Sequence, residues 1–247
     1  MTSMTRPRQS IETAVRRAMG YGLIARCLAF PDAVGAAAMR ESAAAGRELL
    51  KGTALERLAD CTVAAVTEPL EGRYSRLFTF STSVDCPTFE TAYLSTDVAQ
   101  QTHRMADING FYRAFGVDTV GSGFRPDDIC VELEFMGFLC RKQVYAAEHL
   151  GAPRVSQTLR AQKMFLKEHL GRWGAPLGLR IARRAADDAF YSEVGQALHD
   201  WLQADCELLG VGPIETVDLP RMEWADPNAD EVPESGRIID SDDIVVM

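Results

Sequence analysis

One segment constrains the fold more than any other, because residues 129–147 carry apolar side chains on several faces of a helix. Apolar residues recur at i, i+4, i+7, i+11, i+15 and i+18, namely Ile129, Leu133, Met136, Cys140, Val144 and Ala147. Others lie around the remaining sides, namely Val131, Phe135, Phe138 and Leu139. A helix that is apolar nearly all round must be buried. The pattern predicts a central helix, begun by Asp127 or Asp128 as N-cap, with other helices packed around it.

The rest of the chain up to residue 210 also has helical periodicity. No segment alternates polar and apolar residues for long enough to predict a strand. Besides the central helix, helices are expected over 9–30, 33–50, 53–67, 97–115, 155–171, 176–184 and 187–209. Pro31 should end the first, and Gly116 should cap another in the left-handed conformation. The sequence predicts an all-α fold, a single globular domain of eight or nine helices over residues 1–210.

Residues 211–247 have a different composition. They contain ten Asp or Glu, two Arg and four Pro, which predicts an extended acidic C-terminal tail outside the helical core. The tip, IIDSDDIVVM at 238–247, is apolar again around three aspartates, so it could dock on a groove or an edge. Residues 1–210 are nearly neutral, with 25 acidic and 24 basic residues. No basic stripe is present, so a nucleic-acid partner is excluded.

Cysteine spacing and the N-terminal segment bear on the compartment. The six cysteines never form a C-x-x-C pair, so neither a metal site nor a redox dithiol is expected, and a reducing compartment, the cytoplasm, is indicated. Arg16 and Arg17 before a short apolar stretch have the outline of an export signal. Arg26 interrupts that stretch and the apolar residues keep a helical spacing, which favours an amphipathic first helix. No apolar run is long enough to span a membrane.

Catalytic motifs are missing from the sequence. There is no G-x-S-x-G, H-E-x-x-H or phosphate-binding loop, and the four histidines show no ligand pairing, so no catalytic residue and no cofactor is expected. The notable polar group is acidic: Asp127, Asp128, Glu132 and Glu134. Asp128 and Glu132 share a helix face. Their carboxylates are either a helix cap with solvated acids or an acidic patch that receives a basic peptide or a substrate amine.

Four segments resemble one protein family. RPDDICVELEFMGFL (125–139) is similar to the signature of the TorD/DmsD/NarJ redox-enzyme maturation chaperones, in which Pro-Asp-His leads into a helix reading E-L-E-F-M. YSRLFTF (74–80), CPTFETAYL (86–94) and FLKEHLGRW (165–173) resemble further family segments in the same order. The resemblance covers about residues 10–210. Asp128 stands where the family usually has His, so a role that needs the imidazole does not carry over.

The resemblance implies a cytoplasmic chaperone that binds the apo catalytic subunit of a molybdenum oxidoreductase, its twin-arginine signal peptide, or both. It implies assistance with cofactor insertion and proofreading before export, as a monomer or homodimer without stable membrane association. The residues it implies in client binding are Tyr74, Leu77, Phe78, Pro87, Phe89, Glu90, Tyr93, Asp127, Asp128, Glu132 and Glu134. A basic, apolar peptide needs carboxylates beside an aromatic groove, and these residues can supply both.

Other interpretations stay open at this point. The cluster of Asp127, Asp128 and Glu132 is compatible with a small metal- or nucleotide-dependent hydrolase, and the chain is also compatible with a structural subunit held permanently by a partner. The acidic tail is either a disordered solubilising segment or an internal competitor whose apolar tip covers the client groove.

Overall fold

The computed structural model describes residues 5–65, 70–78, 86–119, 123–212 and 214–217. In these ranges the protein is all-α, as predicted, with ten helices where eight or nine were expected. They are α1 Thr5–Leu28, α2 Ala33–Leu50, α3 Glu56–Ala65, α4 Glu71–Phe78, α5 Thr91–Leu94, α6 Val98–Ala114, α7 Ile129–His149, α8 Ala152–Glu168, α9 Leu170–Arg184 and α10 Ala189–Leu209. The additional helices are α4, which overlaps the family-like segment 74–80, and α5, which lies in the family-like segment 86–94. The tail from residue 218 lies outside the described residues.

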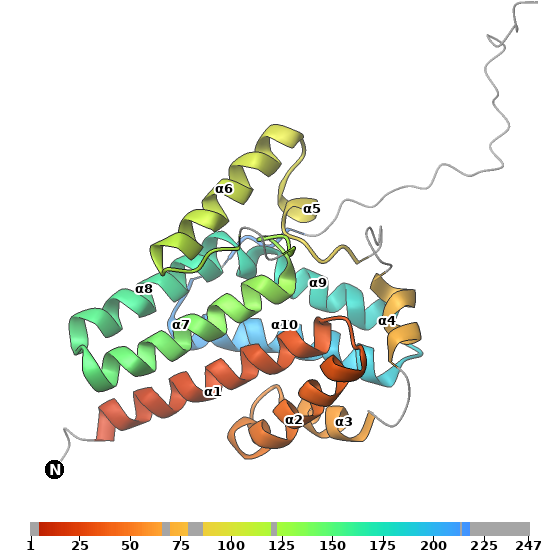
Figure 1. The fold of residues 1–247 in the computed structure, drawn as a ribbon, viewed down its shortest axis with the longest axis horizontal. Coiled ribbons are helices and arrows are strands. Elements are labelled where there is room, and N and C mark those ends of the chain that lie inside the picture. Colours follow the sequence, from red (N-terminus) through yellow and green to blue (C-terminus); the bar gives the residue numbers. More distant parts are fainter. Residues whose placement is uncertain (1–4, 66–69, 79–85, 120–122, 213, 218–247) are drawn as a thin grey trace, which may run out of the picture.

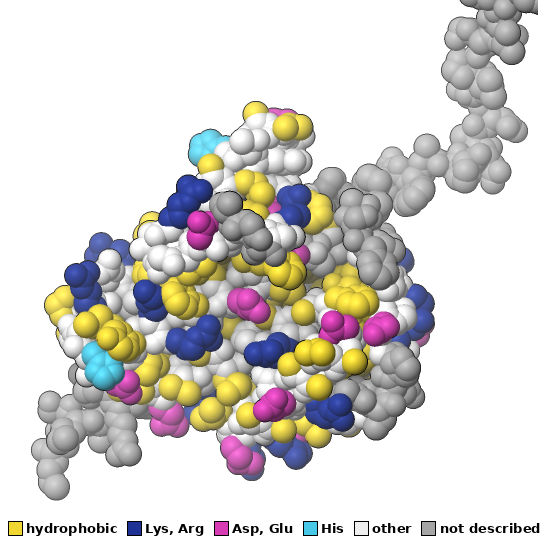
Figure 2. Space-filling model, in the orientation of Figure 1, with side chains coloured by type: hydrophobic (Ala, Val, Ile, Leu, Met, Phe, Trp, Pro, Cys, Tyr) yellow, Lys and Arg dark blue, Asp and Glu magenta, His cyan; other side chains and the backbone are white. Residues whose placement is uncertain are grey.

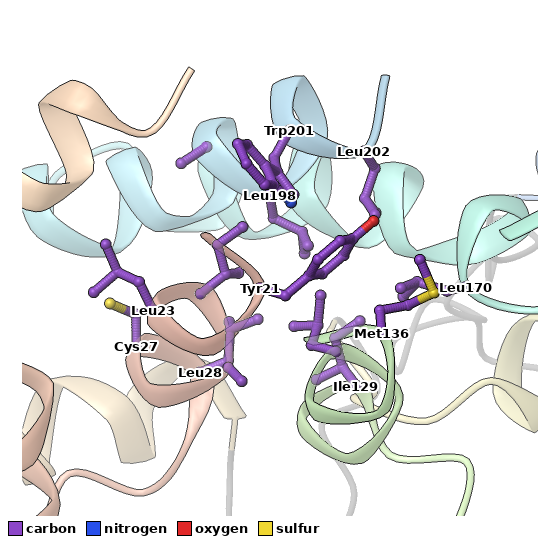
Figure 3. Close-up of a cluster of buried hydrophobic side chains, with 14 of the residues drawn as sticks. Tyr21, Leu23, Cys27, Leu28, Ile129, Met136, Leu170, Leu198, Trp201 and Leu202 are labelled. Carbon is purple, nitrogen blue, oxygen red and sulfur yellow. The ribbon is translucent and has the colours of Figure 1, made fainter. Parts of the chain in front are cut away.

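The central helix is α7, as its periodicity predicted. It lies between α1 and α8 and also contacts α9, while α2 and α3 pack together beside α1 (Figure 1). Tyr21 of α1 is fully buried where α7, α9 and α10 meet it, among Met136, Leu170 and Leu202 (Figure 3). Helix α6 projects from one edge of this body. The core therefore forms around α1, α7, α9 and α10, and the family-like segments 125–139 and 165–173 contribute buried residues to it.

Short polar side chains and glycines set the helix ends. Asp32, Asp97, Asp128 and Asp188 each accept a hydrogen bond from a backbone N–H in the first turn of the helix that follows. Such side chains satisfy N–H groups that have no partner inside the helix. Gly116 follows α6 with a positive φ of 76°, as its predicted role as a left-handed cap requires. The predicted N-cap of the central helix is confirmed as Asp128.

Helix α9 differs from the prediction. The sequence suggested a helix to residue 171 and a short one from Pro176, but α8 ends at Glu168 and α9 runs from Leu170 through Pro176 to Arg184. Helix α9 packs closely on α10 where Gly178 faces Gly195. A Cβ on Gly178 would lie 2.6 Å from the Gly195 carbonyl oxygen, so only glycine permits this approach. Helix α9 continues through the proline, with this close contact to α10 directly after it.

Pro176 explains how the chain beyond α10 is held. Proline has no N–H, so the Arg172 carbonyl four residues earlier lacks its helical donor. The Val217 N–H donates to that carbonyl at 2.8 Å, and the Ile214 side chain lies over Gly171. Residues 214–217 therefore pack on α9, although the sequence assigned them to the tail.

Replacing Pro176 with alanine should release this segment. The new N–H competes for the Arg172 carbonyl, so we expect faster amide hydrogen exchange at Val217 while α9 itself becomes more stable, because proline is unfavourable inside a helix. Mass spectrometry of peptides covering 214–217 measures the exchange. Pro153→Ala is the control, since Pro153 lies in the first turn of α8, where an N–H has no helical acceptor. Unchanged exchange at Val217 would contradict this account.

Candidate functional site

Two loops that are far apart in the sequence join at the start of α7. Glu90 N–H donates to the Asp127 carbonyl and Ile129 N–H donates to the Thr88 carbonyl, both at 2.8 Å. These bonds pair Phe89 with Asp128 as an isolated antiparallel bridge. The family-like segments 86–94 and 125–139 therefore join here, and we call residues 88–91 with 125–129 the loop junction.

Asp127 is the buried anchor of the loop junction. Its carboxylate is fully buried and accepts hydrogen bonds from the Thr91 hydroxyl at 2.7 Å and the Thr91 N–H at 3.2 Å. The Arg125 guanidinium donates to both carboxylate oxygens at 3.0 Å. Arg125 also lies over the Phe89 ring, 4.4 Å from its centroid. The Asp127 carboxylate thus has an internal partner on each oxygen.

Asp128 caps α7 from a half-buried position. It accepts from the Cys130 N–H at 2.8 Å and from the Thr88 hydroxyl at 3.1 Å. Burial raises the pKa of its carboxyl, and these hydrogen bonds oppose the shift. Asp128 is thus a helix cap that also joins the two loops.

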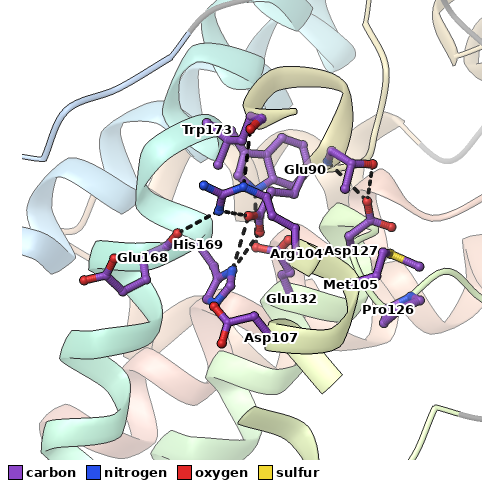
Figure 4. A network of polar contacts seen from close by, with 12 residues as sticks. Glu90, Arg104, Met105, Asp107, Pro126, Asp127, Glu132, Glu168, His169 and Trp173 are labelled. Carbon is purple, nitrogen blue, oxygen red and sulfur yellow. Dashed lines mark hydrogen bonds and ion pairs between the residues drawn. The ribbon is translucent and has the colours of Figure 1, made fainter. Parts of the chain in front are cut away.

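Glu90 is the centre of a buried ionic network (Figure 4). It is fully buried, and it accepts from Arg104 of α6 at 2.7 Å while His169 Nδ1 lies 3.1 Å away. His169 stands at the break between α8 and α9, and its Nε2 is 3.5 Å from Asp107 of α6. The network therefore ties α6 to the loop junction and to the α8–α9 corner.

Glu132 lies beneath this network and is not on the surface. It is fully buried and accepts a hydrogen bond from Trp173 Nε1 at 3.2 Å. Burial raises the pKa of Glu132 well above its ordinary value, and the adjacent Glu90 carboxylate raises it further. The expectation that Asp128 and Glu132 form one exposed acidic patch is corrected, because α7 is covered on this side by α9.

Glu132→Gln should flatten the dependence of stability on pH. In the unfolded chain the Glu132 carboxyl ionises at its ordinary pKa. In the folded protein it stays protonated until the pH reaches its raised pKa. The free energy of unfolding therefore falls as pH rises between these values, by up to about 1.4 kcal/mol per pH unit. Glutamine keeps an acceptor for Trp173 but does not ionise, so the fall of the free energy of unfolding with pH disappears.

Urea unfolding between pH 5 and pH 8 measures the slope. Glu134→Gln is the matched control, since Glu134 is on the same helix and exposed. Equal slopes in wild type and Glu132→Gln would show that Glu132 is ionised in the folded protein.

The remaining predicted residues lie in two other places. Pro87 and Tyr93 are buried beside the loop junction, where the Tyr93 ring packs 5.2 Å from Trp173. On α4, Tyr74 and Phe78 pack edge-to-face against Tyr191 of α10. The half-buried Leu77 lines a separate pocket with Arg73, Arg76 and Arg184. The structure thus unites the predicted loop and α7 residues, while the α4 residues pack against α10.

Glu134 borders a groove at the outer face of α7. The groove has a volume of about 280 Å³ and lies between α7, the end of α6 and the following loop. Its lining is mainly aromatic and aliphatic, with two carboxylates: Tyr112, Val117, Asp118, Thr119, Phe124, Val131, Glu134, Phe135, Phe138 and Arg141. Phe124 is 71% exposed. Hydrophobic side chains gather over α7 and beside α6 on this face (Figure 2). We call this the α7 groove.

Sequence reasoning missed three members of the ionic network: Arg104, His169 and Trp173. His169 is fully buried; its Nδ1 lies 3.1 Å from Glu90, whereas its Nε2 has no hydrogen-bond partner among the described residues. A signal existed in FLKEHLGRW, where His169 and Trp173 are four residues apart in a family-like segment. Their partners, Glu90 and Glu132, lie on distant segments, so helical periodicity alone does not connect them.

Comparison with known proteins identifies the class. The nitrate reductase delta subunit family matches residues 47–177, more than half of the chain, so the chain belongs to this NarJ/TorD-type chaperone family. A perchlorate reductase assembly chaperone protein of Dechloromonas aromatica (strain RCB) is 29% identical over 203 residues, covering 76% of this chain and 88% of the relative. The resemblance read from the four segments is confirmed.

These findings remove the hydrolase interpretation. The family and the relative are assembly chaperones and not enzymes. The carboxylates proposed for a metal are also engaged otherwise, with Asp127 bound by Arg125 and Thr91, Asp128 capping α7, and Glu132 next to Trp173. Within the described residues, no helix is long and apolar enough to cross a membrane.

Proposed function

We propose that the chain is a cytoplasmic chaperone that holds the apo catalytic subunit of a molybdenum oxidoreductase and receives its twin-arginine signal peptide in the α7 groove. The family supports the coarser statement, a molybdoenzyme assembly chaperone. The observation that carries the finer one is the α7 groove itself, where an aromatic wall adjoins the carboxylates of Glu134 and Asp118.

The chemistry of the groove matches a peptide that is both basic and apolar. Aromatic side chains in the wall, such as Phe135 and Phe138, form a surface on which the apolar stretch of the peptide packs. Carboxylates form strong hydrogen bonds with guanidinium groups, and exposed Glu134 is available at the rim. The loop junction acts differently, because its acids are buried; it fixes the start of α7 and so positions the groove. Binding before cofactor insertion delays export of an unfinished enzyme.

The test measures binding of a fluorescent peptide with two consecutive arginines followed by about ten apolar residues. Reversing both rim charges, by Asp118→Lys and Glu134→Lys, should weaken binding by about tenfold or more, and raised salt should weaken binding to the wild type but not to the variant. Glu148→Lys is the matched control, since Glu148 is exposed near the far end of α7. Equal affinities of the wild type and the double variant, or an equal loss in Glu148→Lys, would refute the assignment of the groove.

A second experiment separates a chaperone from a permanent subunit. Size-exclusion chromatography of the chain with the catalytic subunit, cofactor-free and cofactor-loaded, measures whether the complex dissociates. A chaperone binds the cofactor-free subunit and leaves the loaded one, whereas a structural subunit stays with both.

A further inference from the structure

A second groove lies on the other flank of α7, between α1, α2 and α7. It has a volume of about 410 Å³. Its lining is apolar apart from one serine and two arginines: Val15, Ala18, Met19, Gly22, Arg26, Ser42, Arg141 and Val144. We call it the α1 groove. Lys and Arg side chains stand among hydrophobic ones over α1 and α7 (Figure 2).

The two arginines of the α1 groove are exposed and available. Among the described residues, neither Arg26 nor Arg141 has a hydrogen bond or ion pair, and no acidic side chain lines the groove. The floor is open as well, because a Cβ on Gly22 would meet no atom within 4 Å. The site therefore fits an apolar segment that carries negative charge.

We propose that the tip of this chain's own tail, residues 238–247, binds in the α1 groove. The tip carries Ile238, Ile239 and the Ile244–Val246 cluster for the apolar floor. Asp240, Asp242 and Asp243 lie between these clusters, and their negative charge is complementary to the two arginines of the rim. This chemistry is the reverse of the client groove, where Glu134 and Asp118 would repel the aspartates. The tip therefore occupies the α1 groove and not the client groove.

The tether permits this contact. The last described residue, Val217, is held on α9, and 20 residues separate it from Ile238. Extended, they reach up to roughly 70 Å, whereas a body of this size is about 45 Å across. A segment on such a tether acts at an effective concentration near the millimolar range, so weak intrinsic affinity suffices. Arg141 lines both grooves, so the bound tip also holds a side chain of the client site.

Photo-crosslinking of the full chain tests the proposal. A photoreactive amino acid replaces Ile244, and mass spectrometry after irradiation identifies its partner. We expect crosslinks to residues 15–26 and 141–144. Mixing isotopically heavy and light chains distinguishes links within one chain from links between two. Links to other surfaces, or mainly between chains, would overturn the proposal; the second result would indicate a groove filled by another copy.

Two sets of variants make the result specific. Gly22→Trp should fill the groove and reduce the crosslink about tenfold, while Gly110→Trp on α6, where a side chain also has open space, should not. The double variant Arg26→Glu with Arg141→Glu should reduce the crosslink similarly. Adding Asp240→Lys, Asp242→Lys and Asp243→Lys to that double variant should restore the crosslink. Thermal unfolding verifies that each variant is folded. A crosslink that survives both sets would overturn the proposal. The outcome is independent of client binding, because no client is present.

Discussion

Replacing Asp205 with alanine should destabilise the protein by about 3 to 5 kcal/mol, a large part of the 5 to 15 kcal/mol that stabilises a typical domain. Asp205 of α10 and Arg17 of α1 form a buried ion pair, with Arg17 Nη2 donating to Asp205 at 2.8 Å. The Tyr21 hydroxyl donates to the same carboxylate at 2.6 Å, and Arg17 also donates to Gln162. Alanine leaves a buried guanidinium and a buried phenol without their acceptor.

Urea unfolding monitored by circular dichroism measures this loss. Asp60→Ala is the matched control, because the Arg47–Asp60 ion pair has a similar 2.8 Å distance but exposed side chains, and it should change stability by no more than about 0.5 kcal/mol. Arg17→Met combined with Asp205→Leu should recover part of the stability, since an apolar pair needs no compensating charge, while the Tyr21 hydroxyl still lacks its acceptor. A small effect of Asp205→Ala would show that water reaches the Arg17 guanidinium.

Glu90→Ala should have the next largest effect, about 2 to 4 kcal/mol, with a local signature in α6. The substitution removes the acceptor of Arg104 and the partner of His169 in the interior. Removing the Glu90 charge also lowers the pKa of Glu132, which offsets part of the loss. Because Arg104 joins α6 to the loop junction, amide exchange over residues 98–114 should accelerate more than exchange over α10.

Asp107→Asn is the control for this second variant. Asp107 also faces His169, but its side chain is 57% exposed, so its loss should have little effect on stability. Glu90→Gln keeps the shape and an acceptor for Arg104, and it should lie between alanine and wild type. Uniform acceleration of exchange across all helices would contradict a local role for Glu90 at α6.

Helical periodicity was sufficient to predict the helices that bury one or more apolar stripes. It identified α7 as the central helix because Ile129, Leu133 and Met136 recur every turn, and of the two predicted N-cap candidates, Asp127 and Asp128, the structure shows Asp128. Periodicity failed at α9, because the carbonyl freed by Pro176 is satisfied by Val217, a contact that no local pattern reveals. At this proline the helix continues, and the tertiary structure offers the orphaned acceptor another donor.

The sequence predicted which segments form the site, but it did not predict which of the side chains there are exposed. The family-like pieces named the two loops that meet, yet Glu132 was expected at the surface because it lies four residues after Asp128. Sequence spacing gives the face of a helix, but it does not say which neighbour covers that face. His169 and Glu90 are 79 residues apart, so their pairing follows from the fold alone. Conversely, the positions of the exposed Glu134 and Phe124 side chains depend only on where α7 begins.

The Arg17–Asp205 pair has a consequence for how the chain is made. Asp205 follows Arg17 by 188 residues, so at about 5 to 20 residues per second the ribosome adds it roughly 10 to 40 s later. During that interval α1 has no α10 to pack on, and Arg17 lacks the Asp205 carboxylate. The body therefore closes only near the end of synthesis, and a protein that assists the folding of another is itself exposed to premature association while it is being translated.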